Sequence, residues 1–159
     1  MSQDFYLGNP NLKKVGTEIQ FTKHQIQEYL KCKEDPVYFA MNYIKIISLD
    51  EGIVPFNMWD FQQELIESFH EHRFNIAKLP RQTGKSTTCV SYLLHYILFN
   101  DNVNVGILAN KLSTARDLLS RLQLAYEQLP LWIQQGIVVY NKGSMELENG
   151  SKILAASTS

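Results

Sequence analysis

The stretch of sequence that decides the fold is Leu79-Pro80-Arg81-Gln82-Thr83-Gly84-Lys85-Ser86-Thr87. Its second half matches the end of the pattern G-x-x-x-x-G-K-[ST], in which backbone N–H groups of a loop and of the following helix converge on phosphate oxygens. Leu79 occupies the position of the first glycine, so the loop departs from the common form. We therefore predict a nucleotide phosphate-binding loop at residues 79–87.

Four positions of this loop have separate predicted roles. Gly84 lets the backbone approach a phosphate closely, and Lys85 can reach the β- and γ-phosphates of a nucleoside triphosphate. The hydroxyl of Ser86 is a ligand for Mg²⁺. Arg81 could neutralise charge that develops during phosphoryl transfer, as an arginine finger supplied in cis. The alternatives are a chance Gly-Lys-Ser triplet and a solvated loop arginine.

The segments around the loop predict an α/β fold. Residues 74–79 form a short apolar-rich run typical of a strand, residues 85–99 a helix, and residues 103–109 a second buried strand. A strand, a helix and a second strand in this order favour a parallel sheet. Helical spacing returns over residues 113–128, and residues 137–140 are expected to be extended.

A hairpin is predicted near the end of the chain. Asn149-Gly150 lies between two strand-like runs, residues 145–148 and 151–155. This dipeptide is a strong hairpin signal because both turn positions are expected to have positive φ.

The first half of the chain predicts an arm followed by helices. Residues 1–20 lack periodicity and are expected to form an extended or weakly ordered arm. Thr22 begins a helix that continues to Lys33, and Asp35 is placed to cap a second helix with an apolar face that extends to Ile47. Residues 59–69 predict an amphipathic helix.

The overall composition is that of a globular protein, with 45% apolar and 19% charged residues. Fifteen Lys and Arg stand against 16 Asp and Glu, so no global positive field is available to hold a nucleic acid. Cys32 and Cys89 lack a CxxC spacing, which fits unpaired thiols in a reducing, intracellular compartment. We expect neither a signal peptide nor a transmembrane span.

A glutamine about twenty residues before the loop is a candidate for base recognition. It lies in Asp60-Phe61-Gln62. The side-chain amide of Gln62 offers both donors and an acceptor, which match the edge of adenine. The alternative is that Gln62 only occupies the polar face of its helix.

Taken in order, these residues resemble the large terminase subunit of T-even-like tailed bacteriophages. The core of the resemblance is Arg81-Gln82-x-Gly84-Lys85-Ser86, with Asp60-Phe61-Gln62 before it and Gly106-Ile107-Leu108-Ala109 after it. Nearly the whole chain is covered, because similar segments occur at Tyr6-x-Gly8-Asn9-Pro10-Asn11-Leu12-Lys13, Asp35-x-Val37-Tyr38-Phe39-Ala40, Gln135-Gly136-Ile137-Val138 and Asn141-Lys142-Gly143-Ser144-x-Glu146-Leu147-x-Asn149-Gly150-Ser151.

The resemblance implies an ATP-driven motor that packages double-stranded DNA into a phage prohead. Its fold would be a P-loop NTPase of the ASCE (RecA/helicase-like) type with an incomplete sheet. An N-terminal arm and helical subdomain would occupy residues 1–55, and part of the motor domain residues 56–159. The implied partners are double-stranded DNA, the portal protein, the small terminase subunit and further copies in a ring. The implied location is the cytoplasm of the infected bacterium.

The resemblance also assigns the site. Lys85 and Arg81 would be catalytic, and Ser86 would bind Mg²⁺. The family pattern places adenine contacts at Gln62 and, through a shorter amide, at Asn57. The remaining ATP contacts would come from the loop: Arg81, Gln82, Thr83, Gly84, Lys85, Ser86 and Thr87.

The Walker B aspartate, the catalytic glutamate and the C-terminal nuclease of such motors would lie beyond Ser159. In such motors the strand before the phosphate loop also pairs with strands that come later in the chain. We therefore expect these 159 residues alone to fold poorly and not to hydrolyse ATP. Two other interpretations remain at this stage: a helicase-type DNA translocase, which would continue into a second motor domain, and a non-catalytic nucleotide-binding or scaffold fragment.

Overall fold

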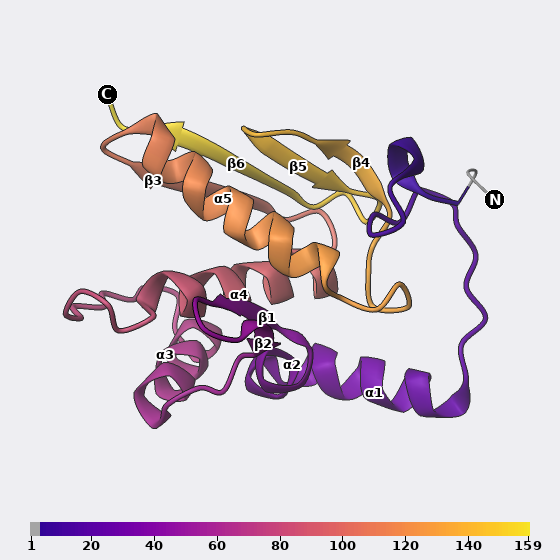
Figure 1. Cartoon of the computed structure of the whole chain (residues 1–159), viewed down its shortest axis with the longest axis horizontal. Helices are drawn as coiled ribbons and strands as arrows, with labels where there is room; N and C mark the ends of the chain where they lie inside the picture. The colour runs from indigo at the N-terminus through magenta and orange to yellow at the C-terminus, as the bar shows by residue number, and fades with distance from the viewer. Residues whose placement is uncertain (1–3) are drawn as a thin grey trace.

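The computed structural model describes residues 4–159 as a mixed α/β fold, in which five α-helices accompany a four-stranded sheet and a two-stranded hairpin (Figure 1). The elements in chain order are η1 (Tyr6–Gly8), α1 (Lys23–Glu34), α2 (Pro36–Tyr43), β1 (Lys45–Ser48), β2 (Gly52–Pro55), α3 (Asp60–Glu71), α4 (Lys85–Phe99), β3 (Asn104–Ala109), α5 (Leu112–Glu127), β4 (Ile137–Tyr140), β5 (Ser144–Leu147) and β6 (Lys152–Ser157). Among the residues described, no helix is long and apolar enough to cross a membrane.

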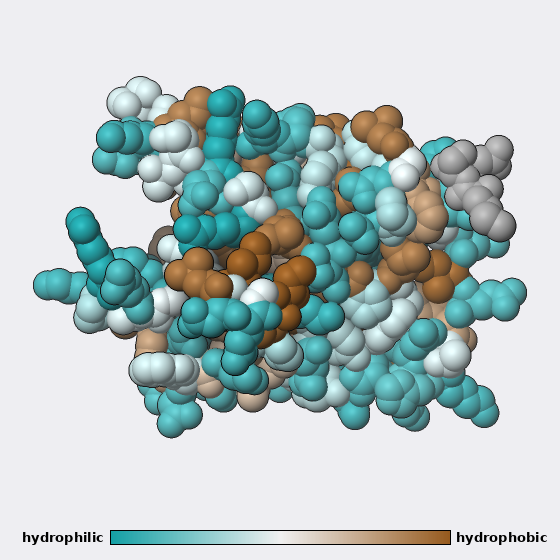
Figure 2. All heavy atoms as spheres, in the orientation of Figure 1, coloured by the Kyte–Doolittle hydropathy of each residue, from teal (hydrophilic) through white to brown (hydrophobic). Residues whose placement is uncertain are grey.

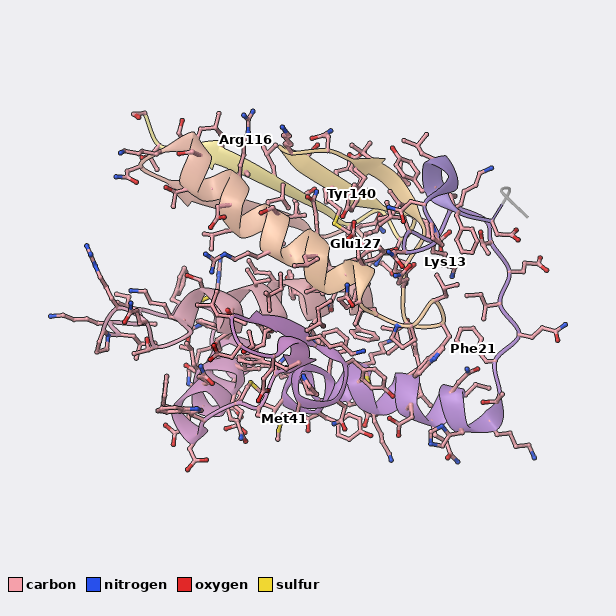
Figure 3. All side chains as sticks on the ribbon, in the orientation of Figure 1. Lys13, Phe21, Met41, Arg116, Glu127 and Tyr140 are labelled. Carbon is pink, nitrogen blue, oxygen red and sulfur yellow. The ribbon has the colours of Figure 1, made fainter. Side chains whose placement is uncertain are left out.

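The larger sheet has the strand order β3-β6-β5-β4. β3 and β6 are parallel, with Ile107 opposite Ala155, and the other two pairs are antiparallel. α5 packs on one face of this sheet and against α4 on its other side, so α5 separates the sheet from the remaining helices (Figure 1). Tyr140 of β4 donates a hydrogen bond to Glu127 of α5 over 2.8 Å, and Figure 3 shows the two side chains together.

The predicted helix starts in the first half of the chain are confirmed. Thr22 caps α1 in a reciprocal arrangement with Gln25, and the carboxylate of Asp35 accepts hydrogen bonds from the first backbone N–H groups of α2. The Nε2–H of His95, in α4, donates to the carbonyl of Cys32 in α1 over 2.7 Å. This bond joins the N-terminal helices to the helix that follows the predicted phosphate-binding loop.

The second helix is shorter than predicted. α2 ends at Tyr43, and the residues expected to continue its apolar face form β1, which pairs with β2 as an antiparallel hairpin. The β-branched residues Ile46 and Ile47 favour extended backbone, which explains the early end of the helix. Side chains of the hairpin contribute exposed apolar surface, among them Ile47 and Ile53. Figure 2 shows hydrophobic atoms gathered where Figure 1 draws this hairpin.

The N-terminal arm, predicted to be extended or weakly ordered, contacts the start of β4 through its described residues; residues 1–3 of the predicted arm lie outside them. The carbonyl of Lys13 accepts a hydrogen bond from the N–H of Ile137 at the start of β4 over 2.8 Å. The carboxylate of Glu148 accepts from the N–H groups of Gly16 and Gly136. The arm thus contacts the start of β4, a partner that the composition of the arm does not indicate.

The strand predicted before the phosphate loop is absent. Residues 72–80 form no helix or strand, and the side chains of Phe74 and Ile76 are 82% and 100% exposed. A strand needs a neighbour for its backbone groups, and no strand in residues 4–159 pairs with this segment. The parallel pair forms instead between β3 and β6.

The second predicted strand, β3, is present but only half-buried. Ile107 faces α5 and is buried, whereas Leu108, on the opposite face, is 66% exposed. A helix covers one face of the sheet only, so burial alternates along the strand.

The hairpin at Asn149-Gly150 is present with a different turn. Gly150 has a φ of 81°, but Asn149 is not among the residues with positive φ. The N–H of Gly150 donates to the carbonyl of Leu147, and the N–H of Leu147 donates to Ser151. These bonds describe a three-residue connection with glycine at its left-handed position. The side-chain amide of Asn149 donates to the carbonyls of Ile97 and Asn100 at the end of α4.

Candidate phosphate-binding site at the start of α4

The candidate site is the loop that leads into α4. Gly84 is the N-cap of this helix, with a φ of 71°, and Gln82 also has a positive φ, of 62°. No side chain caps the helix, whereas Thr88 donates from both its N–H and its hydroxyl to the carbonyl of Gly84. The first N–H groups of α4 therefore have no acceptor in their own helix, and they carry the positive end of its dipole. Left-handed residues in a turn beside such groups are typical of concave anion sites.

Lys85 brings a positive charge back over the loop. Its ammonium donates to the carbonyl of Leu79, six residues earlier, over 3.4 Å. The hydroxyl of Thr83 donates to the carbonyl of Pro80 over 2.9 Å and closes the turn from inside. The loop thus has its own internal bonds, and the lysine spans it from the first residue of α4.

The other predicted loop contacts differ in exposure. Arg81 and Gln82 are exposed, and Ser86 and Thr87 are half-buried in the first turn of α4. The guanidinium of Arg81 takes part in none of the ion pairs formed within residues 4–159. A phosphate bound at the start of α4 would therefore not have to compete with a carboxylate for Arg81.

Gln62 is held at the loop, in the first turn of α3. Its side-chain oxygen accepts from the N–H of Trp59 over 2.9 Å and so caps α3, while its Nε2 donates to the carbonyl of Thr83 over 3.0 Å. The residue is 6% exposed. A Cβ at position 84 would lie 2.5 Å from Nε2 of Gln62, so a side chain there would push this amide away, and the φ of 71° separately favours glycine. The sequence predicts Gln62 as an adenine contact, which stays a prediction; in the structure its amide lies against the backbone of the loop.

Asn57 is not joined to this cluster. It is exposed, between the buried residues Phe56 and Met58, and its own N–H donates to the carbonyl of Pro55. Within residues 4–159 no hydrogen bond connects it to residues 79–87. The predicted adenine contact at Asn57 stays a prediction.

The loop before α4 and the carboxyl ends of the parallel strands are on the same side of the molecule, with α5 between α4 and the sheet (Figure 1). β3 and β6 run in parallel, and Figure 1 shows their carboxyl ends at the same end of the molecule as the loop before α4. Crevices outside the carboxyl ends of parallel strands are the usual ligand sites of such sheets. The N–H of Thr158 donates to the carbonyl of Ala109, so the two strand ends stay together.

The residues present fit a nucleoside triphosphate better than they fit a metal alone. Unpaired amide groups, Lys85 and Arg81 together offer hydrogen bonds and positive charge to phosphate oxygens. No group of three or more His, Cys, Asp or Glu side chains in the described part of the chain could hold a metal ion. A Mg²⁺ here would depend on the hydroxyl of Ser86 and on phosphate oxygens, which is how this ion is commonly held beside nucleotides.

Two contributors to the site were not predicted from the sequence. The carbonyl of Leu79 accepts from Lys85, and Thr88, which is fully buried, fixes the carbonyl of Gly84. A threonine four residues after a helix-starting glycine is a weak signal for such a bond, because Thr often donates to the carbonyl four residues earlier. The backbone role of Leu79 has no sequence signal.

No protein-family model matches the chain.

Proposed function

We propose that this chain binds ATP through residues 79–87 and is the ATP-binding part of a DNA-packaging motor of the large-terminase type. The observation that carries the proposal is the start of α4. Three features that favour a bound phosphate meet there: N–H groups without a side-chain cap, a left-handed Gly84 and the ammonium of Lys85. The resemblance of the loop and its flanking segments to T-even-like terminases supplies the motor and DNA-packaging parts of the proposal.

Each residue of the proposed site has a defined task. The N–H groups at the start of α4 hold phosphate oxygens, and Lys85 supplies a charge that can leave the carbonyl of Leu79 for a phosphate. Arg81 neutralises negative charge from the exposed side of the loop. The hydroxyl of Ser86 would be a ligand for the Mg²⁺ that accompanies the triphosphate. Bound ATP and Mg²⁺ supply the phosphoryl group and its countercharge.

Within the α/β class, we propose that the fold is of the RecA/helicase-like ASCE type. Its support is the parallel pair β3 and β6, the packing of α5 between that pair and α4, and the position of the loop on the same side of the molecule as the carboxyl ends of the pair. The segment before the loop, residues 74–79, takes no strand conformation here, so the proposal depends on the other features.

Equilibrium binding of ATP in the presence of Mg²⁺, followed by calorimetry, tests the nucleotide part of the proposal. The Lys85→Ala chain should bind at least about tenfold more weakly, because a charge-assisted contact contributes roughly 1.5–3 kcal/mol. Lys142→Ala is the matched control, since Lys142 is an exposed lysine in the β4–β5 turn. Equal affinities for the wild type and Lys85→Ala would overturn the proposal.

The motor part has a separate test in the reading frame beyond Ser159. A nuclease domain encoded there supports the packaging assignment. A second motor domain would replace it with a helicase-type translocase.

A further inference from the structure

The amide of Gln62 makes two hydrogen bonds to backbone groups that the proposed ATP site does not explain. Its oxygen accepts from the N–H of Trp59 and its Nε2 donates to the carbonyl of Thr83. The identity of each atom is fixed by its partner, because a backbone N–H can only donate and a carbonyl can only accept. With 6% of the residue exposed, this amide is committed to two backbone partners.

These bonds connect the loop to the rest of the fold. The hydroxyl of Thr83 and the ammonium of Lys85 bond to carbonyls within the loop itself. Among residues 4–159, two side chains from other elements donate to carbonyls of residues 79–83: Lys85 of α4 donates to Leu79, and Gln62 of α3 donates to Thr83. Pro80, Arg81 and Gln82 are exposed, so burial does little to fix the shape of the loop. Gln62 therefore holds the end of the loop at Thr83, and Lys85 holds its beginning at Leu79.

The bond to Thr83 also sets the direction of a neighbouring donor. A trans peptide is planar, so its C=O and N–H groups point in opposite directions, and the described residues contain no cis peptide. When Gln62 holds the carbonyl of Thr83 inward, the N–H of Gly84 must point away from Gln62. Gly84 is exposed, and within the described part of the chain its N–H has no acceptor. This N–H is therefore aimed outward at the start of α4.

From this geometry we infer that Gln62 is a positioning residue for the triphosphate and not a reader of the base. It acts through the Thr83–Gly84 peptide, which it fixes so that the N–H of Gly84 faces a bound phosphate. The inference rests on the proposed nucleotide function of the loop. Its consequence is that loss of the Gln62 amide weakens binding of every ligand with a triphosphate, whatever base the ligand carries.

Binding of three ligands, namely ATP, GTP and inorganic tripolyphosphate, tests this inference. Gln62→Met keeps the length of the side chain and removes both hydrogen bonds. It should weaken all three ligands by the same factor, about three- to tenfold, as expected for the loss of one or two neutral hydrogen bonds. Gln63→Met is the matched control, because Gln63 lies in the same helical turn and bonds to Met58 instead of the loop.

The outcomes separate the inference from the proposed function. A loss confined to ATP would overturn the inference and restore Gln62 as an adenine contact. Unchanged binding of all three ligands by a folded Gln62→Met chain would assign Gln62 a purely structural role and also overturn it. If the wild type binds none of the three, the proposed nucleotide function itself fails. The resonance of the Gly84 amide should shift in Gln62→Met and stay in place in Gln63→Met before any ligand is added.

Discussion

Replacement of Gly84 by alanine is the perturbation that most sharply tests the packing of the phosphate loop. Two separate costs are expected. Alanine at a φ of 71° costs about 1–2 kcal/mol, partly offset by about 0.4–1 kcal/mol because the unfolded chain loses freedom. In addition, the new Cβ would lie 2.5 Å from Nε2 of Gln62 and would displace it from the carbonyl of Thr83. A buried amide that loses its partner costs about 1–3 kcal/mol.

The sum predicts a loss of about 3 kcal/mol in the free energy of unfolding for Gly84→Ala, measured by urea denaturation followed by far-ultraviolet circular dichroism. Gly52→Ala isolates the first cost, because Gly52 has a φ of 77° and open space at its Cβ position. That variant should lose about 1 kcal/mol. In a Gln62→Ala background the clash disappears, so Gly84→Ala should then cost about 1 kcal/mol as well. Equal losses for the two glycine variants in the wild-type background would refute the packing of Gln62 against the loop.

Two further predictions concern the bonds that hold α4 at its middle and its end. Burial lowers the pKa of His95 from 6.5 to about 4. Between these pH values the unfolded state binds more protons than the folded state, so the free energy of unfolding should fall by about 2 kcal/mol from pH 7 to pH 5. His95→Gln, whose amide can still donate to Cys32, should lose that part of the pH dependence, and an unchanged pH profile would show that His95 does not cause it. Asn149→Ala removes the amide that donates to Ile97 and should lower the free energy of unfolding by about 1–2 kcal/mol. The control Asn104→Ala, at an exposed position on β3, should change it by less than about 0.5 kcal/mol. Similar losses for both variants would contradict the role of Asn149 at the end of α4.

The local signals in the sequence predicted the helices well. Thr22 and Asp35 cap the helices they were expected to cap, and α4 has the predicted bounds. These features depend on residues within one or two turns of each other, so a single sequence is enough to identify them. The end of α2 was missed because apolar residues at helical spacing outweighed the strand preference of the two isoleucines that follow.

Features that depend on distant partners could not be predicted. Residues 74–79 have the composition of a strand, but a strand also needs a neighbour, and composition does not show whether one is available. The docking of the arm depends on Glu148 and Ile137, more than 120 residues from their partners. The same reason applies to Gln62: its spacing from the loop suggested a shared site, but only the fold shows that the amide faces the carbonyl of Thr83.

The central claim, that a triphosphate binds at the start of α4, is tested most directly by amide hydrogen exchange with and without ATP and Mg²⁺. Exchange should slow at Gly84, Lys85 and Ser86. The first turn of α5, residues 112–114, is the internal control, because that helix also starts without a side-chain cap. The account predicts protection at α4 that exceeds any change at α5. No protection at α4, or equal protection at both helix starts, would contradict it.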